Sequence, residues 1–164
     1  MKPERFIELV KSNQKPLRRF LITLCCGNRE EAEDIAQDTF VKAYLSSPNF
    51  EERFKFSTWL FKIAYNTYLD RRKRAGSNVH FTVIGEDGWI PEVSVEEDNF
   101  KYQSLYNALK QISERERTAI LLHYIGGYSV KESAEIMNCS PGALKLLLMR
   151  GRNRLKELLD LERK

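Results

Sequence analysis

Apolar residues in the first part of the chain recur every three or four positions, the spacing that places them on one face of an α-helix. This pattern predicts a helix over residues 3–12, a second helix that starts at Pro16, and a third over residues 30–45. Proline suits the first turn of a helix because its missing N–H would have no partner there. Gly27 with Asn28 supplies the stop after the second helix. The third helix is expected to bury a stripe made of Ala32, Ile35, Ala36, Phe40 and Ala43.

A fourth helix is predicted to run to about Arg74, with Ser57 or Thr58 as its N-terminal cap. Its expected core face consists of Leu60, Ile63, Ala64 and Thr67. A surface helix normally carries polar residues on its other faces. These faces instead carry Trp59, Phe61, Tyr65, Asn66 and Tyr68, and the helix ends in a basic run over residues 71–74. We expect Phe61 and Tyr68 to belong to the core, which leaves Trp59 and Asn66 as a candidate binding surface.

The segment over residues 75–100 differs in composition from both of its neighbours. It holds three glycines, one proline, six acidic residues and no lysine or arginine, so it is predicted to be a linker. Val79, Phe81 and Val83 alternate as they would in a short strand. Helical spacing resumes near Phe100, and the chain is therefore predicted to be all-α, with two small helical domains joined by a flexible acidic linker.

The last part of the chain has the layout of a helix-turn-helix. Ser113 with Glu116 and Ser129 with Glu132 each form the sequence pattern of a capping box. The second box opens a short helix, after which Asn138 can take a left-handed turn conformation. Ser140 and Pro141 then start a long final helix. The inward positions of that helix are expected to be Leu144, Leu148 and Leu155.

The net charge of +4 conceals two basic blocks around the acidic segment. Fifteen basic and ten acidic residues give residues 1–74 a balance of +5, and twelve basic and seven acidic residues give 101–164 the same balance. Basic blocks attract phosphate backbones by Coulomb forces and counterion release. A nucleic-acid partner is therefore the leading hypothesis, and an ordinary solvated surface is the alternative.

Other classes of protein receive little support from the sequence. The three cysteines, Cys25, Cys26 and Cys139, form no disulfide or zinc pattern and are expected to be reduced and buried. His80 and His123 are isolated, so no catalytic residues, metal ligands or cofactors are expected. The chain lacks an apolar stretch for membrane insertion and a secretory signal at its N-terminus, which predicts a cytoplasmic protein.

Three surfaces are candidates for binding. The second helix of a helix-turn-helix enters the major groove, so Pro141–Arg150 would read DNA, although a charged helical hairpin without this role has the same pattern. Aromatic rings on a basic surface stack on unpaired bases, which suits the helix over 57–74 and the loop before it. Asp34, Gln37, Asp38 and Val41 line one face of the third helix, which is either solvated or a docking site for a basic partner.

Three motifs resemble those of the extracytoplasmic-function (ECF) RNA polymerase sigma factors of the sigma-70-like family. They are AEDIAQDTF over residues 32–40, STWLFKIAYNTYLDRRKR over 57–74, and SVKESAEIMNCSPGALK over 129–145. The resemblance extends from about Arg5 to Leu159. It implies a sigma domain 2 over residues 1–75, an acidic linker over 76–100 that threads the polymerase channel, and a sigma domain 4 over 101–164.

The resemblance also assigns roles to the candidate residues. It implies that the third helix binds the core RNA polymerase through Asp34, Gln37, Asp38 and Val41. It implies that the −10 promoter element is opened and held by Phe54, Lys55, Phe56, Trp59, Asn66, Arg71, Arg72 and Arg74. The residues expected at the −35 element are Ser140, Gly142, Ala143, Lys145, Leu146, Arg150 and Arg152. An anti-sigma factor is an expected regulator, by resemblance only.

One departure from the family pattern lies in the final helix. Many relatives have a serine and then an arginine where this chain has Leu146 and Leu147. Exposed leucines would weaken phosphate contacts but could touch thymine methyl groups or an inhibitory partner. The competing function is a stand-alone helix-turn-helix regulator that binds duplex DNA without polymerase, for which a ligand pocket or dimer face in residues 1–74 would be the sign.

Overall fold

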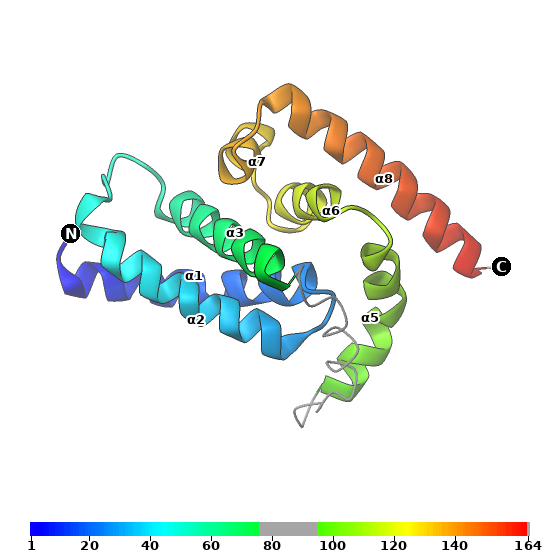
Figure 1. The fold of residues 1–164 in the computed structure, drawn as a ribbon, viewed down its shortest axis with the longest axis horizontal. Coiled ribbons are helices and arrows are strands. Elements are labelled where there is room, and N and C mark those ends of the chain that lie inside the picture. Colours follow the sequence, from blue (N-terminus) through cyan, green and yellow to red (C-terminus); the bar gives the residue numbers. More distant parts are fainter. Residues whose placement is uncertain (76–94, 164) are drawn as a thin grey trace.

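The computed structural model describes residues 1–75 and 95–163, and every regular element in these ranges is a helix (Figure 1), which confirms the all-α prediction. The N-terminal half consists of α1 (Pro3–Leu24), α2 (Arg29–Ser46), the short 3-10 turn η1 (Ser47–Asn49) and α3 (Phe56–Ala75). The C-terminal half consists of α5 (Val95–Lys110), α6 (Glu114–Ile120), the π-helical turn η3 (Leu121–Ile125), α7 (Val130–Met137) and α8 (Pro141–Arg163). The alternation predicted at Val79 to Val83 lies outside the described residues.

Helix α1 is continuous, so the prediction of two helices separated before Pro16 is wrong. Pro16 lies inside the helix and is exposed. Proline in a helix interior costs about 3 kcal/mol because it removes a hydrogen bond and crowds the preceding turn. Apolar side chains that are buried before and after the proline along α1 offset this cost: Phe6 is 7% exposed and Leu17 is fully buried. Tertiary packing thus overrides the local signal.

The helix starts of the N-terminal half are set partly by caps and partly by packing. Asn28 caps α2, since its side chain accepts a hydrogen bond from the Glu31 N–H at 3.1 Å. Helix α3 starts at Phe56, so Ser57 and Thr58 lie in its first turn and are not its cap. The reason is that Phe56 is buried among aromatic rings, which fixes the backbone one residue earlier than the polar residues would.

The helix-turn-helix has the predicted geometry. Ser129 and Glu132 form a complete capping box at the start of α7, and Asn138 takes the left-handed conformation with φ 52° after it. The hydroxyl of Ser140 accepts the Ala143 N–H at 3.1 Å, which caps α8. At the start of α6, Ser113 accepts the Glu116 N–H, which is half of the predicted box.

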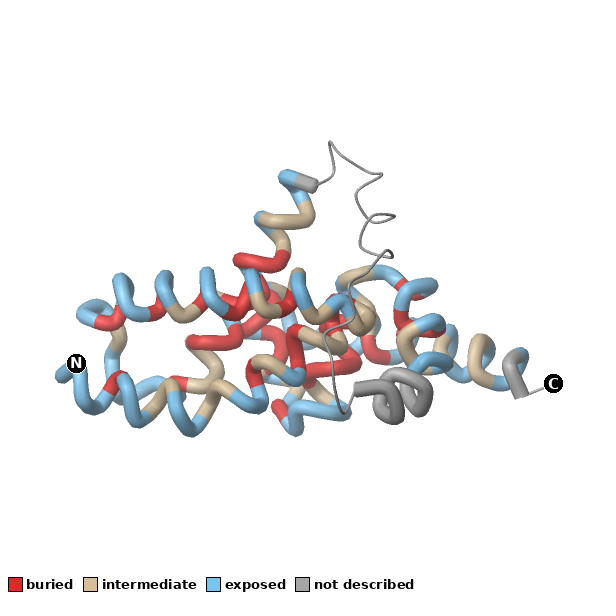
Figure 2. The backbone as a smooth tube through the Cα atoms, turned by 90° about the horizontal axis from the view of Figure 1, so that it is seen from below, coloured by how far each residue is buried: buried red, intermediate tan, exposed pale blue. Residues whose placement is uncertain are grey.

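The two halves share one hydrophobic core. Helices α1, α2 and α3 pack into a bundle, α8 packs on α6 and α7, and α7 lies against α3. The cluster of buried apolar residues runs without interruption from Leu21 and Phe61 in one half to Tyr128 and Leu144 in the other. Figure 2 shows these buried residues gathered in the middle of the molecule, where the halves meet.

Two smaller expectations differ from the structure. Helix α5 begins at Val95, within the predicted linker and before the expected start near Phe100. The three cysteines are free, but only Cys25 is buried, whereas Cys26 and Cys139 are half-exposed. Across the described ranges, no helix is long and apolar enough to span a membrane.

Candidate functional site

The predicted polymerase-binding residues lie together on the exposed face of α2. Asp34, Gln37, Asp38 and Val41 all face solvent, and Val41 is 59% exposed. Sequence reasoning missed Leu45, one turn further along the same face, which is 71% exposed. The four-residue step from Val41 to Leu45 was the available signal. This face therefore combines an acidic end with an apolar end, and we call it the α2 stripe.

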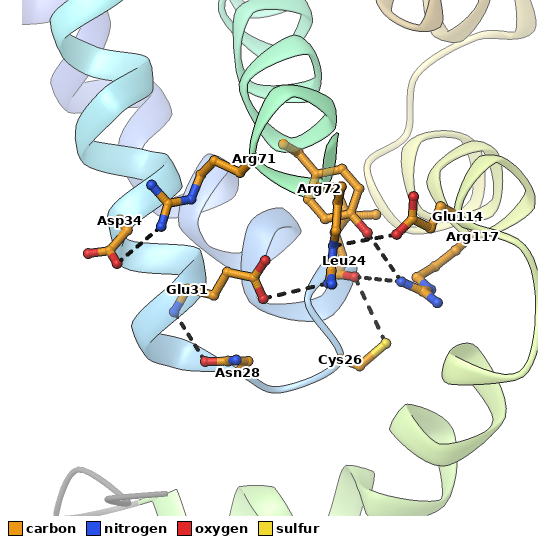
Figure 3. A network of polar contacts seen from close by, with 10 residues as sticks. Leu24, Cys26, Asn28, Glu31, Asp34, Arg71, Arg72, Glu114 and Arg117 are labelled. Atoms are coloured by element: carbon orange, nitrogen blue, oxygen red, sulfur yellow. Dashed lines mark hydrogen bonds and ion pairs between the residues drawn. The ribbon is translucent and has the colours of Figure 1, made fainter. Parts of the chain in front are cut away.

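Arg71 lies against the α2 stripe, although the family resemblance implied a role for it in DNA binding. Its guanidinium forms ion pairs at 3.4 Å with Asp34 and at 3.4 Å with Asp38 (Figure 3 shows the pair with Asp34). All three side chains are at least a third exposed, so solvent screens these pairs and each contributes little to stability. Arg71 therefore links the acidic end of the stripe to the end of α3.

The aromatic residues before and within α3 form a cluster of contacting rings. The rings of Phe50 and Phe56 pack against the Trp59 ring, with centroid distances of 4.9 Å and 5.5 Å. Phe6 of α1 packs in turn on Phe56. Phe56 is 6% exposed and thus supports the cluster, so in this arrangement its ring is not offered to DNA. Trp59 is half-buried and Phe54 is 57% exposed. Trp59 and Phe54 are therefore more accessible for stacking than Phe56.

The other residues predicted for −10 DNA extend along α3. Asn66 is exposed and lies two turns after Trp59, which puts both on one face of the helix. Arg72 forms ion pairs with Glu31 at 3.5 Å and with Glu114 of the C-terminal half at 3.4 Å, and Arg74 is exposed at the helix end. Lys55, before the helix, pairs with Glu132 of the C-terminal half at 3.0 Å. Lys55 and Arg72 are thus both paired with acidic residues. Glu132 was expected only in a capping box, and neither Glu31 nor Glu114 was expected as the partner of a basic residue.

The residues predicted for the −35 element gather at the start of α8. Lys145, Leu146 and Arg150 are exposed, as are Ser140 and Gly142, whereas Ala143 is half-buried. Arg152 is exposed but donates a hydrogen bond to the Tyr124 hydroxyl at 3.1 Å. Leu146 and Met149 are 41% and 54% exposed, while Leu148 is buried and Leu147 packs against the core. Of the two leucines that depart from the family pattern, Leu146 is thus exposed and Leu147 is not, and the exposed face at the start of α8 is partly apolar.

These features define the class of the protein: it is all-helical, contains a helix-turn-helix, and carries acidic, aromatic and basic surfaces. Two family models match the chain in this order. Sigma-70 region 2 covers residues 9–78, and Sigma-70, region 4 covers residues 102–155. The first match includes the α2 stripe and α3, and the second includes the helix-turn-helix.

Individual relatives agree with the family models. The chain is 36% identical to the ECF RNA polymerase sigma factor SigW of Bacillus subtilis, over 82% of this chain and 79% of that protein. It is 28% identical to the ECF RNA polymerase sigma factor SigM of the same organism, over 93% of this chain and 94% of that protein. The sigma factor RpoE of Bartonella quintana, solved in complex with the anti-sigma factor NepR, is 30% identical and superposes with a TM-score of 0.80 over 96% of this chain and 98% of that chain. The chain belongs to the ECF RNA polymerase sigma factors.

Proposed function

We propose that the chain binds core RNA polymerase through the α2 stripe and directs it to promoters through two DNA-binding surfaces. Residues 1–75 would act as sigma domain 2, 76–100 as the linker and 101–164 as sigma domain 4. The observation that carries the proposal is the exposed side-by-side arrangement of Asp34, Asp38 and Val41 within the stretch that matches region 2. Acidic and apolar groups together suit a basic partner surface with an apolar centre.

The −10 element would bind along α3. Trp59 and Phe54 offer rings for unpaired bases, and Asn66 offers an amide that can both donate and accept hydrogen bonds. Each stacked base contributes roughly 1–3 kcal/mol without requiring a particular sequence. We infer that strand separation is driven by this binding energy, so that no catalytic step is involved and the chain acts as a binding protein.

The −35 element would bind at the start of α8. Lys145 and Arg150 would contact phosphates on either side of the major groove, and Leu146 would contact a thymine methyl group. An anti-sigma factor is a further proposed partner. We place this activity in the cytoplasm, where polymerase and promoter DNA are found.

The proposal is tested by co-elution of the purified chain with bacterial core RNA polymerase on a sizing column. We expect a stoichiometric complex for the wild type, and at least a tenfold loss of affinity for the Asp34→Lys, Asp38→Lys double variant. The matched control reverses two exposed acids elsewhere, Glu135→Lys and Asp160→Lys, and should still bind. Equal binding by both double variants would remove the docking assignment, and absence of any complex would favour the stand-alone regulator.

A further inference from the structure

The two acidic residues of the α2 stripe share one cation of the neighbouring helix. Asp34 and Asp38 lie four residues apart, so their side chains are one turn apart on the same face of α2. The Arg71 guanidinium meets each of them through a different nitrogen: Nη2 lies 3.4 Å from Oδ2 of Asp34, and Nη1 lies 3.4 Å from Oδ2 of Asp38. Figure 3 shows the Arg71 side chain reaching from α3 to Asp34 on α2. One arginine thus bridges the two carboxylates that are proposed to bind polymerase.

These ion pairs lie in solvent and not in the core. The side chain of Arg71 is 35% exposed, and those of Asp34 and Asp38 are 51% and 52% exposed. Pairs this exposed add little to stability, because water screens the charges and the long side chains lose freedom when they pair. The same exposure leaves both carboxylates open to a cation that belongs to a partner.

Arg71 lowers the negative charge that the α2 stripe presents to a partner. Two carboxylates and one guanidinium leave a single negative charge at this end of the stripe. A basic partner side chain that approaches the acids also meets the guanidinium, and like charges that face each other across an interface oppose binding. Each contact that the partner forms with Asp34 or Asp38 therefore replaces one that already exists within the chain, and only the difference between the two adds to the affinity.

We propose that Arg71 sets the affinity of this chain for core RNA polymerase by competing, within the molecule, with lysine or arginine side chains of the polymerase for Asp34 and Asp38. The proposal rests on the proposed function of the α2 stripe. Removal of Arg71 strengthens polymerase binding, whereas removal of the two acids weakens it. An arginine that only supports the fold, or one that itself contacts the polymerase, would have the opposite effect when removed.

The experiment measures the affinity of the full chain for bacterial core RNA polymerase by fluorescence anisotropy, with fluorescein on the N-terminus of the chain. The test variant is Arg71→Gln. The matched control is Lys73→Gln, which removes the same charge from an exposed position two residues further along α3. Two further variants are Arg71→Lys, which keeps a cation, and a triple variant that adds Arg71→Gln to Asp34→Asn with Asp38→Asn, where the cation has no carboxylate to pair with.

We expect Arg71→Gln to bind polymerase about 2- to 10-fold more tightly than the control, a range set by the small strength of two exposed ion pairs. Arg71→Lys should stay within about twofold of the wild type, because the charge that competes is retained. The triple variant should bind no more tightly than the double variant without Arg71→Gln, since the arginine acts through the two acids.

Unchanged or weaker binding by Arg71→Gln overturns the competition, and weaker binding shows instead that Arg71 contacts the polymerase. An equal gain from Arg71→Gln in the background without the two acids also overturns it, because Arg71 then acts by another route. Failure of the wild type to bind polymerase is a different result, which removes the proposed function of the α2 stripe and this proposal with it.

Discussion

Arg117 of α6 donates a hydrogen bond from Nη1 to the backbone carbonyl of Leu24, 3.1 Å away at the last residue of α1. Its other acceptors are the carbonyls of Leu109 and Ile112 and the hydroxyl of Tyr68. A positive charge at the C-terminus of a helix is favoured by the helix dipole. This one buried side chain therefore links the end of α1, the end of α5 and the middle of α3.

Replacing Arg117 should destabilise the whole molecule. The Arg117→Met variant keeps an apolar stem but leaves several buried carbonyls without a donor, at a cost of about 1–3 kcal/mol in the free energy of unfolding. Urea denaturation measures this change, with Lys131→Met as a control because Lys131 is exposed on α7. An equal midpoint for both variants would mean that water replaces the guanidinium without loss.

Removal of the aromatic surface should affect DNA opening and spare polymerase binding. We expect Trp59→Ala with Asn66→Ala to reduce open-complex formation on a duplex promoter roughly tenfold, as the loss of one stacked base implies. Permanganate reactivity of unpaired thymines measures opening, and Asp70→Ala on the same helix serves as the control. A promoter with a pre-melted bubble should restore activity, and lack of rescue would contradict a role in melting.

The basic residues of α8 should determine how promoter binding depends on salt. Each phosphate contact adds about 0.9 to the slope of log affinity against log salt. Lys145→Ala and Arg150→Ala should therefore each make the slope shallower by about that amount, whereas Lys156→Ala, further along the exposed side of α8, should not. A slope that stays the same in both test variants would argue against phosphate contact.

The stability of the C-terminal half should depend on the ionisation of Glu132. The Ser129 backbone N–H, and then Lys55, hold the pKa of this carboxyl below its ordinary value of 4.5. A lowered pKa in the folded state contributes stability that is present above pH 4.5 and is lost as the pH falls through the lower folded value. The difference in unfolding free energy between wild type and Glu132→Gln should thus be larger at about pH 6 than at about pH 3. A pH-independent difference would show that the charge is not involved.

Local sequence signals predicted the elements whose ends are closed by their own side chains. Ser129 with Glu132 and Asn138 act as expected, because a cap or a left-handed turn needs partners only a few residues away. Asn28 was expected only to help end the preceding helix, and in the structure it caps the start of α2. The predictions failed at Pro16 and at Ser57, where burial of Leu17 and of Phe56 outweighed the local preference. The α2 stripe was visible in the sequence because its residues share a helix face.

The sequence by itself determined the all-α class, the helix-turn-helix, the charge pattern and the family, since each depends on residues that are close along the chain or on recognisable motifs. Only the tertiary structure decided that Lys55 meets Glu132, that Arg72 meets Glu114, and that Arg71 lies on the α2 stripe. The physical reason is that contacts between distant segments depend on how two amphipathic halves bury their remaining apolar surface. Helical periodicity marks which surface is apolar but does not specify which partner covers it.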